Sequence, residues 1–290
     1  MSIDYPKDVK IGIIGGTGSD VTLENPREYK VYTPYGDTSD LIAVGLFHGK
    51  KVAFMPRHGK GHRIPPHNLP NRANLWAMKQ LGVQRIISPS AVGSLQPEHK
   101  KGDFILVTQY IDRTKNRPSS FYDGGQVCHI SQADPFCPEL NDIFYKTGKE
   151  ISGLNIKPSG TYVCIEGPRF STRAESKAFR MWGGDIIGMT CFPEVVLAAE
   201  LGMCYNTVAM VTDLDVWAAQ CKKCKKILNF GEKCPTCQVM PEPLAVSIEE
   251  ILETMEHNAT YLKMLLEKTI PRIPDTPGCR CPHSLEGAII

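Results

Sequence analysis

Short apolar runs rich in β-branched residues alternate with helical patterns along most of the chain. Runs of this length and composition are typical of buried strands. The pattern predicts strands at residues 10–14, 41–47, 51–55, 85–88, 104–107, 161–165, 185–189 and 205–211. Helices are expected at 71–81, where apolar residues have helical spacing, and after Thr172-Arg-Ala-Glu175 and Ser247-Ile-Glu-Glu250, which have the form of capping boxes.

This alternation predicts an α/β fold with a mixed, mainly parallel central sheet flanked by helices. The chain has 290 residues, close to the size at which a single core stops growing, and we expect one domain over residues 1–290. Sheets of this kind bind ligands at the carboxyl ends of their strands. The residues that follow each strand are therefore the candidate site.

Composition and charge exclude several classes of protein. Hydrophobic residues make up 42% of the chain and charged residues 22%, as is usual for a soluble globular protein. The net charge of +2 does not favour binding of the whole molecule to nucleic acid or to a membrane. The N-terminal sequence has no apolar leader, and no stretch approaches the roughly 18 apolar residues of a membrane span, so we expect a cytoplasmic location.

One segment, residues 218–243, breaks the strand–helix rhythm and is predicted to be an insertion. Its cysteines form two pairs, Cys221-x2-Cys224 and Cys234-x2-Cys237, with the spacing of a zinc knuckle. Zinc is the favoured interpretation because four thiolates would fix a segment that has few apolar residues. Two disulfides or four free thiols are the alternatives.

Cysteines outside this segment raise the same question. Cys137 with Cys204, and Cys279 with Cys281, are candidate disulfides if the source is thermophilic, since intracellular proteins of hyperthermophiles are an exception to the reduced state of cytosolic thiols. The sequence does not show the pairing. The tail from residue 271 is rich in Pro and Gly, and we expect it to wrap the surface or a neighbouring subunit.

Polar residues that follow several predicted strands suit a phosphate ion. Gly16-Thr17-Gly18 follows the first strand, where glycines let backbone amides approach an anion. It is not a dinucleotide fingerprint, because Val21 occupies the third glycine position, and no lysine of a P-loop follows. A plain structural turn explains this sequence equally well.

Arg57 and His58 follow another strand, and the guanidinium offers a fork suited to phosphate oxygens. A solvated charged loop is the alternative. A metal bound by His58 and His62 is rejected, because the glycines and prolines around them disfavour the helix that would align them. Ser90, Ala91 and Thr190, from two further strand ends, complete a predicted phosphate cage.

Asp213 and Asp215 follow the apolar strand predicted at 205–211. In isolation such a pair most often caps the next turn. Here four other strand ends already supply phosphate ligands, which favours a second role in binding a substrate.

Taken together, these stretches resemble the methylthioadenosine phosphorylases of the trimeric purine nucleoside phosphorylase superfamily. The matching sequences are IGIIGGTG, RHG, ANLWA, FYDG, ADPFCP, EGPRFSTRAES and PEVVLAAE, which lie between residue 10 and about residue 217. The resemblance implies phosphorolysis of S-methyl-5'-thioadenosine in purine and methionine salvage, with phosphate as co-substrate and no catalytic cofactor.

The resemblance also implies roles for individual residues. Phosphate would be held by Thr17, Arg57, His58, Ser90, Ala91 and Thr190. Substrate would be contacted by Met189 at the ribose, by Phe170, Ser171, Asp213, Asp215 and Ile248 at the purine, and by His62 with the neighbouring subunit's His129 at the 5' substituent. The active form would then be a homotrimer or a homohexamer.

Asp213 and His58 are the candidate catalytic residues. Cleavage between C1' and N9 leaves negative charge on the purine, so a protonated Asp213 could donate to N7 while its other oxygen accepts from a 6-amino group. This requires burial to raise its pKa. Gly188, where many relatives carry Asn, predicts a site that is wider near the base or the sugar.

Three other functions stay open. A purine nucleoside phosphorylase of broad specificity, or a methylthioinosine phosphorylase, would use the same cage. A nucleic-acid-binding or scaffold protein on this fold would use the insertion's lysines, which are Lys222, Lys223, Lys225, Lys226 and Lys233.

Overall fold

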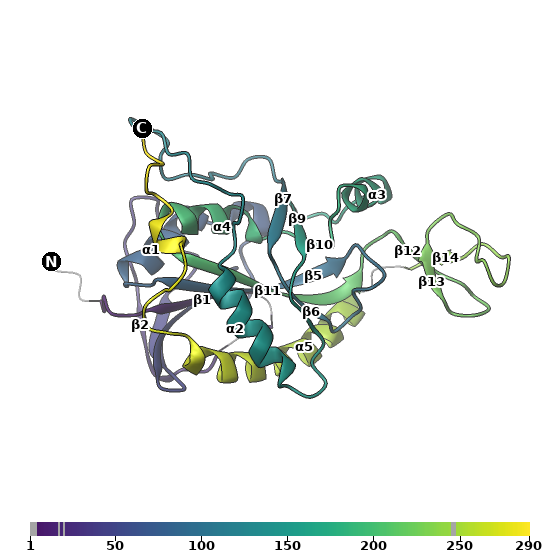
Figure 1. The fold of residues 1–290 in the computed structure, drawn as a ribbon, viewed down its shortest axis with the longest axis horizontal. Helices are drawn as coiled ribbons and strands as arrows, with labels where there is room; N and C mark the ends of the chain where they lie inside the picture. Colours follow the sequence, from purple (N-terminus) through teal and green to yellow (C-terminus); the bar gives the residue numbers. More distant parts are fainter. Residues whose placement is uncertain (1–4, 17, 20, 245–247) are drawn as a thin grey trace.

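A computed structural model describes residues 5–16, 18–19, 21–244 and 248–290, with residue 248 described by its backbone alone. Eleven strands form one mixed sheet in the order β2-β3-β4-β1-β5-β10-β9-β7, with β11 beside β5 and β6, and β8 beside β6 (Figure 1). These strands are β1 (Ile11–Gly15), β2 (Glu24–Tyr29), β3 (Ile42–Phe47), β4 (Lys50–Pro56), β5 (Arg85–Ser94), β6 (Phe104–Leu106), β7 (Gln109–Arg113), β8 (Ile156–Lys157), β9 (Thr161–Ile165), β10 (Ile186–Gly188) and β11 (Cys204–Leu214).

Helices cover both faces of this sheet. They are α1 (Asn71–Gln80), α2 (Pro138–Lys149), α3 (Arg173–Met181), α4 (Cys191–Glu200) and α5 (Ile248–Thr269), with short 3-10 turns at Pro66–Asn68, Ile270–Arg272 and Cys281–His283. Apolar residues of α1 and α4 share one buried cluster, and those of α2 and α5 share another. In Figure 1, α4 and α5 lie on opposite sides of the central strands. The predicted α/β class is confirmed.

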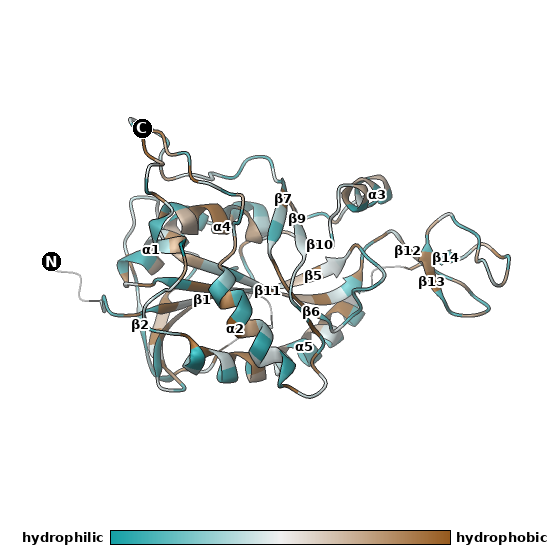
Figure 2. Ribbon diagram, viewed as in Figure 1, coloured by the Kyte–Doolittle hydropathy of each residue, from teal (hydrophilic) through white to brown (hydrophobic). Residues whose placement is uncertain are grey.

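Burial follows the hydropathy of the chain. The central strands β1 and β11 are buried along almost their whole length, and in Figure 2 the helices present hydrophilic residues on their outer turns. No helix among the described residues is long and apolar enough to cross a membrane.

The predicted elements are mostly present, with differences at the sheet edges. β2 and β7 were not predicted because they are exposed edge strands with polar sequences, ENPREY and QYIDR, that lack an apolar run. β5 extends to Ser94, well past the predicted end at 88, because its pairing with β11 continues across Pro89. The Thr172 capping box is confirmed at the start of α3, whereas Ser247 lies outside the described residues.

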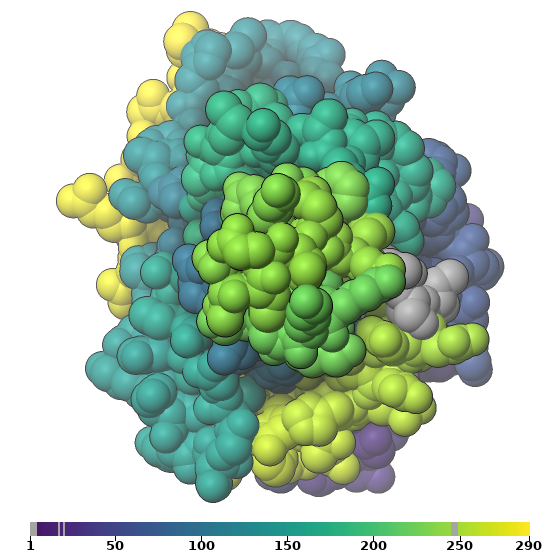
Figure 3. Space-filling view, turned by 90° about the vertical axis from the view of Figure 1, so that its right-hand side faces the viewer, coloured from purple at the N-terminus to yellow at the C-terminus, as the bar shows by residue number. Residues whose placement is uncertain are grey.

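Residues 218–243 form a separate small sheet. Its strands β12 (Ala218–Gln220), β13 (Ile227–Asn229) and β14 (Glu242–Pro243) are antiparallel, with β12 in the middle. The unit projects beyond the end of the main sheet in Figure 1 and stands in front of it in Figure 3. Trp217, just before β12, is buried against Phe179 of α3 and anchors its base.

Candidate active site

A cavity of about 310 Å³ opens at the carboxyl ends of β5 and β11. The predicted site residues that line it are Arg57, His58, His62, Ser90, Ala91, Phe170, Ser171, Met189, Thr190, Asp213 and Asp215. They come from segments as far apart as β4 and β11, so the sheet brings them together, as expected for the strand ends of an α/β fold.

The hydrogen bonding of β5 explains why the cavity lies here. One edge of β5 pairs with β11 from Arg85 to Ser94. The other edge pairs with β1 only as far as Ile87 and with β10 only from Gly93 onward. Among the described residues, the stretch between them, 88–92, therefore has no strand beside it on that edge, and Ser90, Ala91 and Val92 of this stretch line the cavity.

A buried ion pair fixes Arg57 at the cavity wall. Its Nε donates to Oε1 of Glu194 at 2.6 Å, and both side chains are at most 1% exposed. Nη2 donates to the Ile14 carbonyl at 2.9 Å and to Ser88 Oγ at 2.6 Å, while Nη1 donates to the Pro89 carbonyl at 3.2 Å. The Nε edge of the guanidinium thus faces Glu194. Within the described residues, one N–H of Nη1 has no acceptor and could donate to an anion.

Glu194 is held by further donors. Its Oε2 accepts from Ser88 Oγ at 3.0 Å and from the Tyr205 hydroxyl at 2.7 Å. A buried carboxylate needs such partners, because an uncompensated charge in the interior is costly. Glu194 was missed as a site residue, although a glutamate within the apolar sequence PEVVLA signals a buried partner.

Hydroxyl groups gather beside Arg57. Ser90 Oγ lies 3.2 Å from the Thr190 hydroxyl and 3.2 Å from the Tyr162 hydroxyl, and all three residues are buried. Tyr162 was also missed by the sequence analysis, since it lies within the apolar strand β9 and looks like a core residue. Neutral donors beside one fixed cation suit a phosphate dianion.

His58 completes this side of the cavity as a neutral ring. Its Nδ1 lies 2.8 Å from the Ile64 carbonyl, which can only accept, so Nδ1 carries the proton. Burial and the charge of Arg57 lower the pKa of His58 to about 4. Nε2 is then a hydrogen-bond acceptor, suited to a protonated phosphate oxygen or a sugar hydroxyl. His62 stacks on His58, with ring centroids 4.2 Å apart.

The cavity lining also includes two carboxylate residues, Asp213 and Asp215. Burial raises the pKa of Asp213 to about 6, against a hydrogen bond from Thr212 that lowers it. Asp215 Oδ1 accepts from Ser171 Oγ at 2.7 Å, and its Oδ2 is buried without a hydrogen-bond partner among the described residues. Such an orphaned acceptor indicates that a ligand donates to it.

Apolar side chains complete the cavity lining. Phe170 stands at the mouth and is 57% exposed. Val92, Ile165 and Ile187 line the interior. A flat aromatic ligand placed between the phosphate side and the carboxylates would cover these side chains.

The wider site predicted from Gly188 is wrong. A Cβ on Gly188 would lie 1.9 Å from the Tyr162 hydroxyl. The hydroxyl of this tyrosine therefore occupies the space that an asparagine side chain would take.

Three predicted residues are not placed in this cavity. Thr17 and the side chain of Ile248 lie outside the described residues, although Ile251, one turn further along α5, does line the cavity. His129 lies in another part of the chain, where its backbone N–H donates to the Ala288 carbonyl at 2.8 Å. A role for His129 thus depends on a neighbouring subunit.

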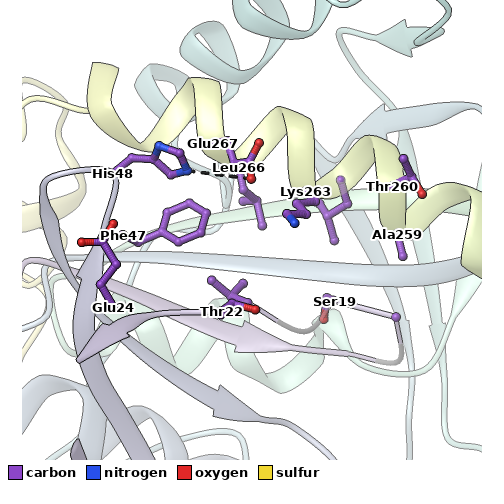
Figure 4. A pocket seen from close by; sticks show the side chains of 13 residues that line it. Ser19, Thr22, Glu24, Phe47, His48, Ala259, Thr260, Lys263, Leu266 and Glu267 are labelled. Atoms are coloured by element: carbon purple, nitrogen blue, oxygen red, sulfur yellow. Dashed lines mark ion pairs between the residues drawn. The ribbon is translucent and has the colours of Figure 1, made fainter. Parts of the chain in front are cut away.

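A second groove lies between α5 and the turn that joins β3 to β4 (Figure 4). Its volume is about 400 Å³. Two of its lining residues, His48 and Glu267, approach each other, with Nε2 of the histidine 3.8 Å from Oε1 of the glutamate. None of the predicted site residues that the structure describes lines this groove. It therefore has neither the hydroxyl cluster nor the paired carboxylates of the first cavity.

Two groups of cysteines could hold a metal. Cys221, Cys224, Cys234 and Cys237 bring their Sγ atoms within 4.8 Å of one another, and the same holds for Cys137, Cys204, Cys279 and Cys281. All eleven cysteines are free thiols, so the candidate disulfides are not present. Both groups lie apart from the cavity lining.

Comparison with known proteins agrees with this geometry. The profile of the Phosphorylase superfamily matches residues 10–236. S-methyl-5'-thioadenosine phosphorylase of Thermofilum pendens is 48% identical over 284 residues, covering 97% of this chain and 99% of that protein. The protein of the same name from Saccharolobus solfataricus is 48% identical over 296 residues, covering 99% and 100%.

Solved structures give a similar result. A methylthioadenosine phosphorylase from an antarctic soil metagenomic library has a TM-score of 0.84 and 40% identity, covering 98% of this chain and 93% of that one. A variant of the adenosine/methylthioadenosine phosphorylase of Schistosoma mansoni, in complex with methylthioadenosine, has a TM-score of 0.78 and 33% identity, with 91% of each chain covered.

Proposed function

This chain belongs to the Phosphorylase superfamily, and on that premise we propose that it converts S-methyl-5'-thioadenosine and phosphate into adenine and 5-methylthioribose 1-phosphate. The observation that carries the proposal is the cavity at the carboxyl ends of β5 and β11. It combines a cage of hydroxyls and one arginine N–H with a partly buried carboxyl group, that of Asp213, whose pKa is raised.

The proposed reaction exchanges two bonds at C1' of the ribose. The C1'–N9 bond breaks and its electron pair goes to the purine, while a phosphate oxygen forms the new bond to C1'. Arg57, Ser90, Ala91 and Thr190 would orient the phosphate, whose charge stabilises the cationic sugar. His58 Nε2 would accept a hydrogen bond from the phosphate or from a sugar hydroxyl.

Asp213 would protonate the leaving purine at N7. Its pKa of about 6 keeps a fraction of the carboxyl protonated near neutral pH, and a purine that excludes water from the cavity would raise the pKa further. The second oxygen would accept from a 6-amino group. Asp215, with its unpartnered Oδ2, would accept from another N–H of the base.

Selectivity for the 5' substituent of the nucleoside would depend on the assembly of subunits. His62 lies on the His58 ring inside the cavity, whereas His129 of the same chain lies elsewhere. We propose that the neighbouring subunit's His129 borders the 5' substituent in a homotrimer or in a hexamer made of two trimers.

The decisive experiment measures adenine released from S-methyl-5'-thioadenosine with and without phosphate. Phosphate-dependent release supports the proposal, and release without phosphate would exclude phosphorolysis. Values of kcat/KM for methylthioadenosine, adenosine, methylthioinosine and inosine separate the alternatives. An inosine value equal to that of methylthioadenosine would favour the phosphorylase of broad specificity.

The small sheet of residues 218–243 is proposed to be held by zinc. Backbone N–H groups of Cys224 and Lys223 lower the pKa of Cys221, to about 6, which favours a thiolate ligand. Sγ of Cys224 lies 3.6 Å from that of Cys234, close to the spacing that tetrahedral zinc imposes. Zinc would supply the cross-link that the short strands cannot supply by packing.

Binding of nucleic acid by this unit is less favoured, since two of its lysines are engaged. Lys222 pairs with Glu242, and Lys226 donates to the Thr236 hydroxyl at 3.1 Å. A mobility-shift assay at physiological salt tests this function, since binding through lysines must weaken steeply as salt is added.

A further inference from the structure

Four thiols from three separate segments converge at the end of the sheet opposite to the cavity. Cys137 precedes α2, Cys204 begins β11, and Cys279 and Cys281 lie in the C-terminal segment. All four Sγ atoms lie within 4.8 Å of one another. Sγ of Cys279 is 3.6 Å from that of Cys137 and 3.3 Å from that of Cys204.

We propose that this cluster is a second zinc site, a tetrathiolate that fastens the C-terminal segment to α2 and β11. Tetrahedral zinc with Zn–S bonds of about 2.3 Å holds its sulfur ligands about 3.8 Å apart, so the thiols need only small shifts to bind it. A disulfide would instead give each sulfur a single partner. Here Cys279 contacts two other sulfurs, and no pair is singled out.

The surroundings of Cys137, one of the two buried cysteines of the cluster, favour a thiolate. Cys137 is the N-cap of α2, and its Sγ accepts a hydrogen bond from the backbone N–H of Leu140 at 3.5 Å. The positive end of the helix dipole stabilises negative charge at this position. Cys137 and Cys204 are fully buried. Four sulfurs without nitrogen or oxygen ligands select a soft metal such as zinc.

The C-terminal segment that carries Cys279 and Cys281 is held in place by hydrogen bonds on both sides of these cysteines. The Thr276 carbonyl accepts from Arg85 at 3.0 Å, and the Gly278 N–H donates to the carboxylate of Glu139 at 3.2 Å. Beyond the cysteines, Ser284 Oγ donates to the Ala199 carbonyl at 2.5 Å. These contacts hold Cys279 and Cys281 next to the buried Cys137 and Cys204. The chain therefore loses little conformational entropy when the metal binds.

Binding needs no redox partner. Each thiol releases its proton to water, and each sulfur donates an electron pair to the metal ion. The site lies at the amino end of β11, whereas Asp213 lies near its carboxyl end, so the metal does not touch the substrate. Its effect is on the tail, which ends in hydrogen bonds between Ile290 and Val127 and between Ala288 and His129.

Through those bonds the metal would also steady the segment that carries His129. This part alone rests on the proposed function, in which the same histidine reaches a neighbouring subunit's substrate.

The test compares two double variants of the full chain with the wild type, all expressed with added zinc. Elemental analysis and native mass spectrometry should find two zinc ions per wild-type chain. C279S/C281S should retain one, and the matched control C234S/C237S, which disables the other cluster, should also retain one. Thermal unfolding of the tail variant should occur at lower temperature than that of the wild type.

Several results would overturn the second site. One is a C234S/C237S variant that contains no zinc, and another is a tail variant that keeps the full wild-type content. Iron in place of zinc would contradict the choice of metal. Alkylation of the denatured, unreduced control variant shows whether Cys137 and Cys204 are thiols, and finding them as disulfides would exclude the tetrathiolate. None of these outcomes depends on whether the chain phosphorolyses a nucleoside.

Discussion

At the scale of single residues, the chemistry of the cavity depends on Asp213. Its carboxyl group is partly buried at the carboxyl end of β11 and is the group proposed to read and protonate a purine. Replacing it with an amide keeps the shape of the side chain but removes the acidic proton.

Asp213→Asn should lower kcat/KM for methylthioadenosine by roughly 10²- to 10⁴-fold, the usual contribution of a general acid. The loss for inosine or methylthioinosine should be much smaller, because an amide can donate to a 6-oxo group. Steady-state kinetics with the four nucleosides measures both. Equal losses for amino- and oxopurines would contradict the proposed role of Asp213.

The wild type and the Asp213→Asn variant should also differ in how their stability depends on pH. The folded pKa of Asp213 is about 6, above its ordinary value of 3.8, so the ionised carboxylate destabilises the folded chain. This group's favourable contribution is complete below pH 3.8 and is lost as the pH rises through 6. Urea unfolding should show the wild type losing up to about 3 kcal/mol relative to Asp213→Asn between pH 4 and pH 7. A constant difference would show that the carboxyl is not buried.

Glu194→Gln should leave Arg57 with a buried and uncompensated charge. We expect a loss of about 3–5 kcal/mol in the free energy of unfolding and a rise in KM for phosphate that exceeds any rise for the nucleoside. Glu150→Gln is the control, since its ion pair with Arg272 is half exposed and should contribute less than about 1 kcal/mol. Similar effects of the two substitutions would show that Glu194 does not position Arg57.

At the scale of secondary structure, the stability of α3 depends on how its N-terminal end is capped. Only Ser176 and Phe179 of this helix are buried, so packing contributes little to it. Its stability depends on the capping box, in which Thr172 Oγ1 accepts from the Glu175 N–H at 3.2 Å and the Glu175 carboxylate accepts from the Thr172 N–H at 2.7 Å. Ser171, just before the cap, lies in the cavity.

Thr172→Ala should lower the free energy of unfolding by about 1 kcal/mol and raise KM for the nucleoside, since the start of α3 would fray. KM for phosphate should not change, because the phosphate residues lie on other elements. Thr260→Ala is a suitable control, as its exposed hydroxyl donates to the Glu256 carbonyl in the preceding turn of α5. A changed KM for phosphate, with the KM for the nucleoside unchanged, would contradict the assignment of the start of α3 to the nucleoside part of the site.

At the scale of the whole molecule, we propose that His129 of a neighbouring subunit completes the active site. His129→Ala and Asp213→Asn should each lose activity towards methylthioadenosine when pure. Mixed assemblies of the two should regain part of it, because some sites then combine Asp213 of one chain with an intact His129 from the next. Light scattering coupled to size exclusion should give a trimer or a hexamer. Monomers, or mixtures without recovered activity, would exclude the shared site.

The alternation of apolar and helical segments determined the α/β class, most strands and the capping box of Thr172, because these depend on local periodicity and local hydrogen bonds. The strand-end residues also indicated a phosphate and purine site, since parallel strands bring their carboxyl ends together.

Only the tertiary structure decided how the groups interact, because those contacts join residues far apart in the chain. Glu194 accepts a hydrogen bond from Nε of Arg57 and so orients the guanidinium at the cavity, and Tyr162 fills the space beside Gly188. Burial, which no local pattern gives, sets the pKa of Asp213. The convergence of all four cysteines likewise follows from packing, since the sequence suggested only the separate pairs Cys137 with Cys204 and Cys279 with Cys281.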